Sequence, residues 1–167
     1  MANKRSQMTS NVAAIQMVSS ADVDENLTTA RRLITAAAGQ GAELVLLPEV
    51  FAVLEGGPMR QYGEVEGSGK IQDFLSEQAR NNKLMVVGGT IPLISRPART
   101  TTDTPDIIEG KRVRPACLVF DAAGKQIARY DKMHLFDVMV DDKQAKYSES
   151  RSFEAGTEIV SLDTTLG

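Results

Sequence analysis

Glu49 occupies a position at which an α/β chain could use a carboxylate. It follows the apolar run over residues 44–47 and Pro48, where a strand is expected to end. A carboxylate beside a buried strand is costly unless another group pairs with it or the protein uses it. Because open α/β sheets bind ligands at the carboxyl ends of their strands, Glu49 is a candidate site residue. The alternative is a capping or salt-bridged glutamate in a loop.

Lys132 lies in the segment YDKMHLFD, residues 130–137, among apolar neighbours. A lysine held in such surroundings can supply a fixed positive charge where negative charge develops in a transition state. The alternative is a lysine whose stem lies on an apolar surface while its ammonium stays in water.

Other reactive side chains are weaker candidates. His134 is the only histidine, and without a second ligand at suitable spacing we expect a structural residue with a local hydrogen bond. Cys117 lies in an apolar strand pattern, where a free cysteine is usually a small buried apolar residue and not a nucleophile. One cysteine excludes an internal disulfide framework and a cysteine-rich metal site. Glu149, between two serines, is by itself an ordinary loop glutamate.

The composition is that of a globular protein of one domain. The chain has 167 residues, a net charge of -3 and a pI near 5.3, so no basic face indicates nucleic-acid binding. Residues 1–10 form a polar tail without the apolar region of a signal peptide, and no apolar run approaches membrane-spanning length. We therefore expect a cytoplasmic protein. No phosphate-binding glycine pattern is present.

Strands and helices alternate in the first half, which predicts parallel βαβ units. A third strand follows a second helix, so the pattern repeats. The expected elements are a strand over 11–18, a helix over 22–41 capped by Asp22 or Asp24 and ended by Gly39 or Gly41, a strand over 43–47, a helix from Ser68 to Arg80, and a strand over 84–88.

The second half is less regular. Residues 92–114 are polar and rich in proline, which predicts a long surface loop. A hairpin is expected from the apolar run 116–120, a turn over 121–125 and a strand over 126–130. Residues 137–157 are expected to be mostly irregular, before a strand over 158–162. No helix follows to cover that strand, so the layers of the sheet look unfinished.

Four segments together resemble one known family. They are AAIQM, GAELVLLPEVF, ARYDKMHLFDV and YSESRSFEAGTEI, and they occur in the family's order between residues 11 and 167. The chain resembles the N-terminal part of the nitrilase superfamily, the carbon–nitrogen hydrolases. The HLFDV segment and the ES-x-x-F-x-x-G pattern are most similar to the Nit-type amidase branch, which includes ω-amidase and the amidase of deaminated glutathione.

The resemblance implies a fold and a site. The fold is an α/β protein of the αββα sandwich type, incomplete in this chain, with residues 11–167 as the N-terminal portion of the domain. Glu49 matches the family's general base, which implies a carboxylate buried next to a strand end, and Lys132 matches its catalytic lysine. Glu149 matches a supporting glutamate. No metal or organic cofactor is implied, and the family usually forms dimers.

The resemblance also implies a reaction for the full-length parent. A small carboxamide of the ω-amide type would be hydrolysed to an acid and ammonia through a cysteine thioester. Cys117 does not match the family's nucleophile, whose segment would follow Gly167. Alternatives within the family are N-carbamoyl amide hydrolysis and nitrile hydrolysis. From another class, the chain could be a truncated fragment or pseudoenzyme that acts by association. A nucleotide-binding protein has less support.

Overall fold

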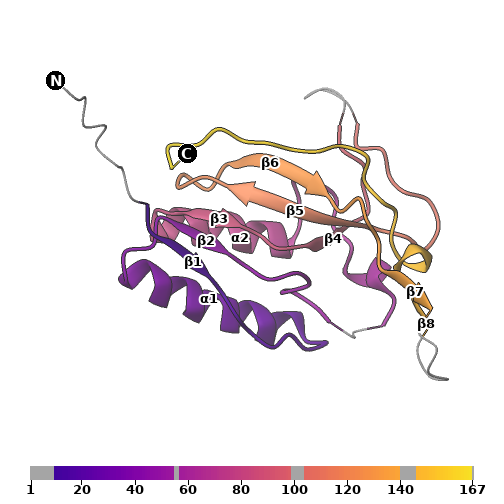
Figure 1. Cartoon of the computed structure of the whole chain (residues 1–167), viewed down its shortest axis with the longest axis horizontal. Coiled ribbons are helices and arrows are strands. Elements are labelled where there is room, and N and C mark those ends of the chain that lie inside the picture. Colours follow the sequence, from indigo (N-terminus) through magenta and orange to yellow (C-terminus); the bar gives the residue numbers. More distant parts are fainter. Residues whose placement is uncertain (1–9, 55–56, 99–103, 140–145, 167) are drawn as a thin grey trace.

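The computed structural model describes residues 10–54, 57–98, 104–139 and 146–166. These residues form a six-stranded mixed sheet with two α-helices, and a separate two-stranded ladder beside it (Figure 1). Of the predicted polar tail over 1–10, only Ser10 is described. The predicted α/β class is confirmed.

The first βαβ unit has the predicted order. Strand β1 (Val12–Ala14) and strand β2 (Leu44–Leu46) are parallel, and helix α1 (Val23–Gly39) connects them. Both strands are shorter than predicted. The Asp22 side chain accepts a hydrogen bond from the Glu25 amide, so this residue is the N-cap of α1.

The second unit adds a short 3-10 helix, η1 (Met59–Tyr62), then α2 (Lys70–Asn82) and the parallel strand β3 (Met85–Val87). The predicted cap by Ser68 is wrong, since Gly69 occupies the N-cap position. Glu64 takes over the cap, because its carboxylate accepts the amide hydrogens of Ile71 at 2.6 Å and Gln72 at 3.2 Å. Glu64 precedes the N-cap residue Gly69 in the chain, farther back than the positions at which a capping residue is sought in a sequence.

Strand β5 (Arg114–Phe120) is the centre of the second half of the sheet. It pairs antiparallel with β3 near Phe120, with β4 (Ile91–Leu93) near Arg114, and along its other edge with β6 (Gln126–Asp131). The hairpin of β5 and β6 confirms the prediction. Strands β3 and β4 lie end to end along one edge of β5, separated by the kink at residues 88–90.

The predicted surface loop over 92–114 is wrong at both ends. Pro92 and Pro115 lie opposite each other in the ladder of β4 and β5. Their carbonyl oxygens face away from each other, toward the Glu64 and Lys132 amides respectively, so neither missing N–H group interrupts the pairing. Ile108 and Val113 are also buried, which further contradicts a surface loop. Residues 99–103 lie outside the described part.

The C-terminal segment also differs from the prediction. Strands β7 (Asp137–Met139) and β8 (Lys146–Ser148) form a short antiparallel ladder, followed by the 3-10 helix η2 (Glu149–Arg151), where mostly irregular chain was expected. The predicted strand over 158–162 is wrong: these residues pair with no described strand and are exposed. An apolar run alone does not specify a strand when no described partner strand lies beside it.

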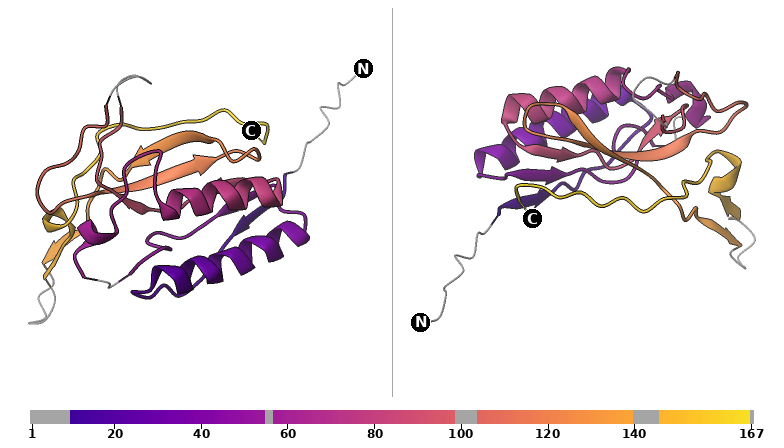
Figure 2. Two further views of the ribbon diagram at one scale, coloured as in Figure 1. Left: turned by 180° about the vertical axis from the view of Figure 1, so that it is seen from behind. Right: turned by 90° about the horizontal axis from the view of Figure 1, so that it is seen from above.

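Both helices cover the same face of the sheet, and residues 157–166 run along the other side (Figure 2). The core lies between the helices and the sheet, and Ile34, Leu75 and Val86 are among its fully buried side chains. The face away from the helices carries a row of small and apolar residues in register across five strands. These are Ala14, Leu46, Val87, Val119 and Ala128.

The capping role of Glu64 makes a prediction about stability. Glu64→Ala removes the acceptor for two amides at the start of α2, so we expect the free energy of unfolding to fall by about 1–2 kcal/mol. Urea unfolding measures this change. Ser68→Ala is the control, because Ser68 is exposed, and should change stability by less than about 0.5 kcal/mol. A larger loss for Ser68→Ala would contradict the assignment.

Candidate active site

The structure brings together the three residues that the sequence singled out. Lys132 Nζ lies 2.8 Å from Glu49 Oε1 and 2.9 Å from Glu149 Oε2. The two glutamates are 100 residues apart in the chain, so the contact depends on the tertiary fold. One ammonium therefore bridges two carboxylates, and Glu49, Lys132 and Glu149 together form the site cluster.

Glu49 reaches the cluster from the carboxyl end of β2. The ladder continues one residue beyond the strand, because the Leu47 amide donates to the Val87 carbonyl at 3.0 Å. The chain then turns, and the Glu49 side chain is 52% exposed. The prediction that this carboxylate is buried is therefore wrong for the described chain, although it does pair with a cation.

Lys132 follows β6 and is fixed on both sides of its backbone. Its amide donates to the Pro115 carbonyl at 3.0 Å, and its carbonyl accepts from the Gly156 amide at 2.9 Å. Its side chain is 21% exposed. Partial burial lowers the pKa of the ammonium, but hydrogen bonds from it to Glu49 and Glu149 outweigh this effect, and the pKa is raised above 10.5. The site lysine is thus held as a cation.

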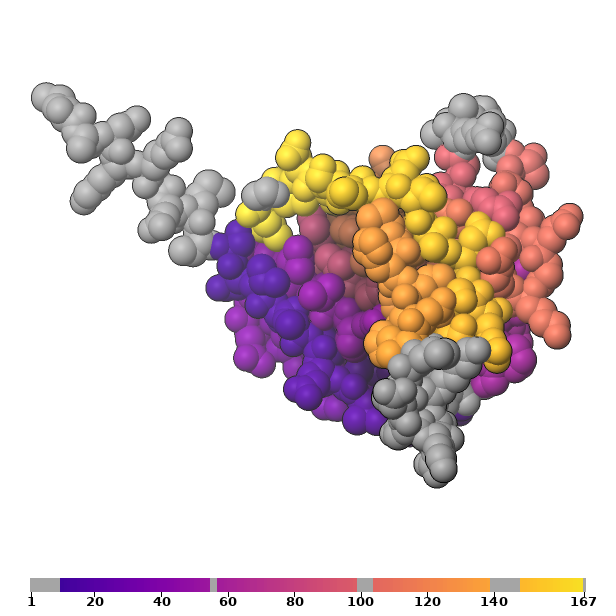
Figure 3. All heavy atoms as spheres, turned by 45° about the vertical axis from the view of Figure 1, so that its right-hand side comes forward, coloured from indigo at the N-terminus to yellow at the C-terminus, as the bar shows by residue number. Residues whose placement is uncertain are grey.

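Glu149 reaches the cluster from the start of η2. The ladder of β7 and β8 folds residues 136 and 149 onto each other: the Glu149 amide donates to the Phe136 carbonyl, and Glu149 Oε2 accepts from the Phe136 amide at 2.7 Å. In Figure 3 the orange segment that includes β7 and the yellow segment that follows β8 adjoin on the molecular surface. The Glu149 carboxylate is thus oriented by a backbone donor as well as by Lys132.

A network of arginines and carboxylates lies behind the cluster. Arg114 Nη1 is 2.7 Å from Asp131, and Arg114 Nη2 is 2.8 Å from Glu154. Asp131 immediately precedes Lys132, while Glu154 lies five residues after Glu149. Arg129 also binds Asp131 at 2.8 Å, and Arg96 binds Glu154 at 2.7 Å. The network therefore holds the two segments that carry Lys132 and Glu149.

Sequence patterns do not reveal this network. Arg114 falls at the end of the predicted loop over 92–114, although it belongs to β5 and is only 12% exposed. One signal for it is present in the sequence. Arg114 stands two positions before the apolar residue Ala116, so in a strand the two side chains share a face, which places a charge on a buried face. Its carboxylate partners lie 17 and 40 residues away, which spacing alone does not reveal.

Cys117 and His134 do not join the cluster through any described hydrogen bond or ion pair. Burial raises the pKa of the Cys117 thiol to about 11, so this cysteine is poorly suited to act as a thiolate. His134 is exposed, and its expected local hydrogen bond stays a prediction. In the described ranges no group of His, Cys, Asp and Glu is arranged to hold a metal ion.

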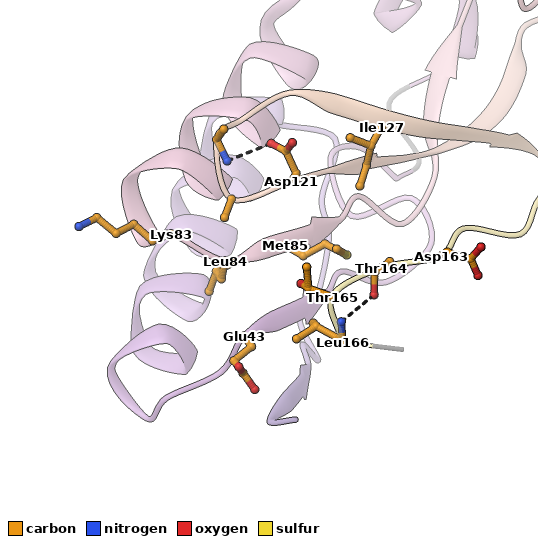
Figure 4. A pocket seen from close by; sticks show the side chains of 12 residues that line it. Glu43, Lys83, Leu84, Met85, Asp121, Ile127, Asp163, Thr164, Thr165 and Leu166 are labelled. Carbon is orange, nitrogen blue, oxygen red and sulfur yellow. Dashed lines mark hydrogen bonds between the residues drawn. The ribbon is translucent and has the colours of Figure 1, made fainter. Parts of the chain in front are cut away.

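A cavity of about 500 Å³ lies at the opposite end of the parallel strands (Figure 4). Glu43 and Met85 line it at the start of β2 and β3, together with the segment 163–166. Two of the three carboxylates that line it already serve the backbone: Glu43 accepts from the Asn11 amide, and Asp121 accepts from two amides of its own turn. This cavity is therefore a poorer candidate for chemistry than the site cluster.

The site cluster combines two chemical capacities. A half-exposed carboxylate can accept a proton from a bound group, and a fixed ammonium can stabilise an oxyanion. The site cluster itself contains no thiol or hydroxyl group. Among the described helices, none is long and apolar enough to cross a membrane.

The ion pairs of Lys132 predict how its pKa responds when either glutamate is replaced. Glu149→Gln removes one of the two negative charges that raise the lysine pKa, so we expect that pKa to fall. The pairing should stabilise the fold below pH 10.5 and be lost as the pH rises through the raised value. A ¹³Cε NMR titration of Lys132 measures the change. Glu49→Gln should act in the same direction, and an unchanged pKa in both variants would contradict the geometry.

Glu154 predicts a pH dependence of stability. Hydrogen bonds from Arg96 and, against an opposing effect of burial, from Arg114 lower its pKa from 4.5 to about 2. Its contribution to stability is present above pH 4.5 and should be lost as the pH falls toward 2. Urea unfolding at several pH values should show a smaller acid-induced loss for Glu154→Gln than for wild type. Glu158→Gln is the control, because Glu158 is exposed, and it should lose as much stability in acid as wild type. Equal acid-induced losses for all three proteins would contradict the role of Glu154.

Comparisons with known proteins agree with this architecture. Residues 11–167 match the carbon-nitrogen hydrolase family. The chain is 31% identical over 158 residues to the deaminated glutathione amidase of Yersinia enterocolitica, covering 94% of this chain and 51% of that protein. It is 31% identical over 154 residues to the omega-amidase NIT2 of Danio rerio, with coverages of 92% and 50%.

A solved structure supports the same relationship. Nit3 of Saccharomyces cerevisiae, a member of branch 10 of the nitrilase superfamily, matches with a TM-score of 0.71 and 28% identity, covering 93% of this chain and 52% of that one. The chain thus spans about half the length of the relatives described here. Its mixed sheet with helices matches the fold of this family, and the match extends over about half of a relative's length. The chain belongs to the carbon–nitrogen hydrolase family.

Proposed function

We propose that the full-length protein containing this chain hydrolyses small carboxamides to a carboxylic acid and ammonia. The observation that carries this proposal is the placement of Lys132 Nζ between the carboxylates of Glu49 and Glu149, at 2.8 and 2.9 Å. Amide hydrolysis needs a base to accept a proton and a positive group to stabilise an oxyanion. The cluster offers both.

The proposed reaction proceeds through a thioester. Glu49 accepts the proton of a cysteine thiol while the sulfur attacks the amide carbonyl, and Lys132 stabilises the resulting oxyanion. Glu49 then gives the proton to the nitrogen, so the C–N bond breaks and ammonia leaves. Glu49 next takes a proton from water, whose oxygen attacks the thioester, and the acid is released with the thiol restored. Glu149 keeps the Lys132 ammonium in place.

The proposed nucleophile is a cysteine other than Cys117. The raised pKa of the Cys117 thiol disfavours the reactive thiolate, and no described contact joins it to Glu49. The relatives are about twice as long as this chain, which leaves room for the nucleophile in sequence that these residues do not include.

The proposed substrate class is a small ω-carboxamide that carries a carboxylate. Two relatives are named deaminated glutathione amidase and omega-amidase, and this is the support for the class. N-carbamoyl amides and nitriles are the alternatives to include in a substrate panel. An N-carbamoyl amide releases carbon dioxide besides ammonia. A carboxamide and a nitrile both release ammonia alone, so the panel separates these two by which compound is consumed.

Glu49→Gln tests the proposed base. The amide keeps the size of the side chain but cannot accept the proton, so kcat for the best ω-amide should fall by roughly 10²–10⁴-fold. Ammonia release by the full-length protein measures this change. Circular dichroism and urea unfolding of the same variant should remain close to wild type, because Glu49 is half exposed.

Cys117→Ala is the matched control for the nucleophile. It removes the thiol of a strand residue, and kcat should stay within about threefold of wild type if another cysteine reacts. Undiminished turnover in Glu49→Gln, or complete loss in a stably folded Cys117→Ala protein, would overturn the corresponding assignment.

A further inference from the structure

The backbone directly after Glu49 has an unfavourable conformation. Val50 has a φ of +50°, in the left-handed region, which is strongly disfavoured for a β-branched residue. In the described chain only one other non-glycine residue has a positive φ: Lys83, which ends α2 in a common left-handed cap. Such strain persists only where the surrounding structure requires it, and it is often found at functional sites.

The residues that follow Val50 require the turn. Phe51, Ala52 and Val53 are at most 1% exposed, whereas Glu49 is 52% exposed, so the chain must enter the core directly after the carboxylate. The Phe51 carbonyl accepts from Ser19 Oγ at 3.1 Å. The buried residue Asn26 donates to the Ala52 carbonyl at 3.0 Å.

The kink between β3 and β4 fixes the other side of this turn. Thr90 Oγ1 accepts a hydrogen bond from the Val50 amide at 3.1 Å. Gly89 has a φ of +48°, and a Cβ at this position would lie 2.0 Å from the Pro48 carbonyl oxygen. The glycine thus lets the kink pack directly against the segment that carries Glu49.

We infer that Val50 and Thr90 are positioning residues, which use a strained turn and one hydrogen bond to aim the Glu49 carboxylate at Lys132. This inference rests on the proposed role of Glu49. Because Glu49 is half exposed, its own side chain has few packing contacts to define its direction. The backbone orientation and the bond to Lys132 therefore determine where its carboxylate lies.

The inference predicts that stability and catalysis respond differently to the same change. Val50→Gly removes the strain and frees the backbone, so kcat should fall roughly 10-fold or more while the thermal midpoint changes little. KM should stay within about threefold of wild type, because substrate binding is affected less than proton transfer. Lys83→Gly removes the same kind of strain at the end of α2 and should leave kcat unchanged.

Thr90 offers a test of the hydrogen bond itself. Thr90→Val keeps the shape but removes the acceptor for the Val50 amide, and kcat should fall in the same way as in Val50→Gly. Thr90→Ser keeps the hydroxyl and should restore most of the activity. A ¹³Cε NMR titration of Lys132 provides a readout without catalysis: its pKa should fall in Thr90→Val and stay near wild type in Thr90→Ser. Glu49 and Glu149 are the charged groups that contact this lysine in the described residues.

The two readouts separate the possible failures. If wild type hydrolyses no amide but the Lys132 pKa falls in Thr90→Val and not in Thr90→Ser, the proposed function is wrong and the positioning role stands. If Thr90→Val and Val50→Gly keep the wild-type kcat and Lys132 pKa, the positioning role is wrong while the proposed function is untouched.

Discussion

The arrangement of this chain depends on one lysine ammonium held between two carboxylates. Lys132 follows β6, Glu49 follows β2, and Glu149 opens η2 beyond the ladder of β7 and β8. The three residues lie far apart in the chain. The sheet must therefore bring the ends of β2 and β6 close together before these contacts can form. A cation at 21% exposure loses part of its hydration, and two carboxylates compensate for that loss. The cluster carries two negative charges and one positive charge. In our proposal Glu49 therefore serves both as an ion-pair partner of Lys132 and as the base.

The surrounding structure restricts the motion of each partner by a different means. An arginine–carboxylate network and the close approach of Gly156 hold the backbone on both sides of Lys132, where a Cβ on that glycine would lie 2.3 Å from the Asp131 carbonyl oxygen. A backbone amide orients Glu149. Glu49 has the most exposed side chain of the three, and its direction depends on the turn at Val50 and on Thr90. Preorganisation of this kind lowers the cost of arranging charges during a reaction.

The sequence predicted the parts of the fold that depend on local patterns. Helix periodicity and the cap at Asp22 located α1, and short apolar runs located β2, β3 and the hairpin of β5 and β6. The errors share a cause, which is that the deciding contact is not local. The sequence pattern places Pro92 in a loop, because its pairing with Pro115 exists only in the folded sheet. The candidate residues Glu49, Lys132 and Glu149 came from strand ends and from the family resemblance, whereas Arg114 and Thr90 act through distant partners and were missed.

The most direct measurement is a crystal structure of the full-length protein with a bound, unreactive ω-amide analogue. We expect a cysteine sulfur, other than that of Cys117, within about 4 Å of the Glu49 carboxylate, and the amide oxygen of the analogue within hydrogen-bonding distance of Lys132 Nζ. A structure in which no thiol lies near Glu49, or in which the analogue binds away from Lys132, would contradict it.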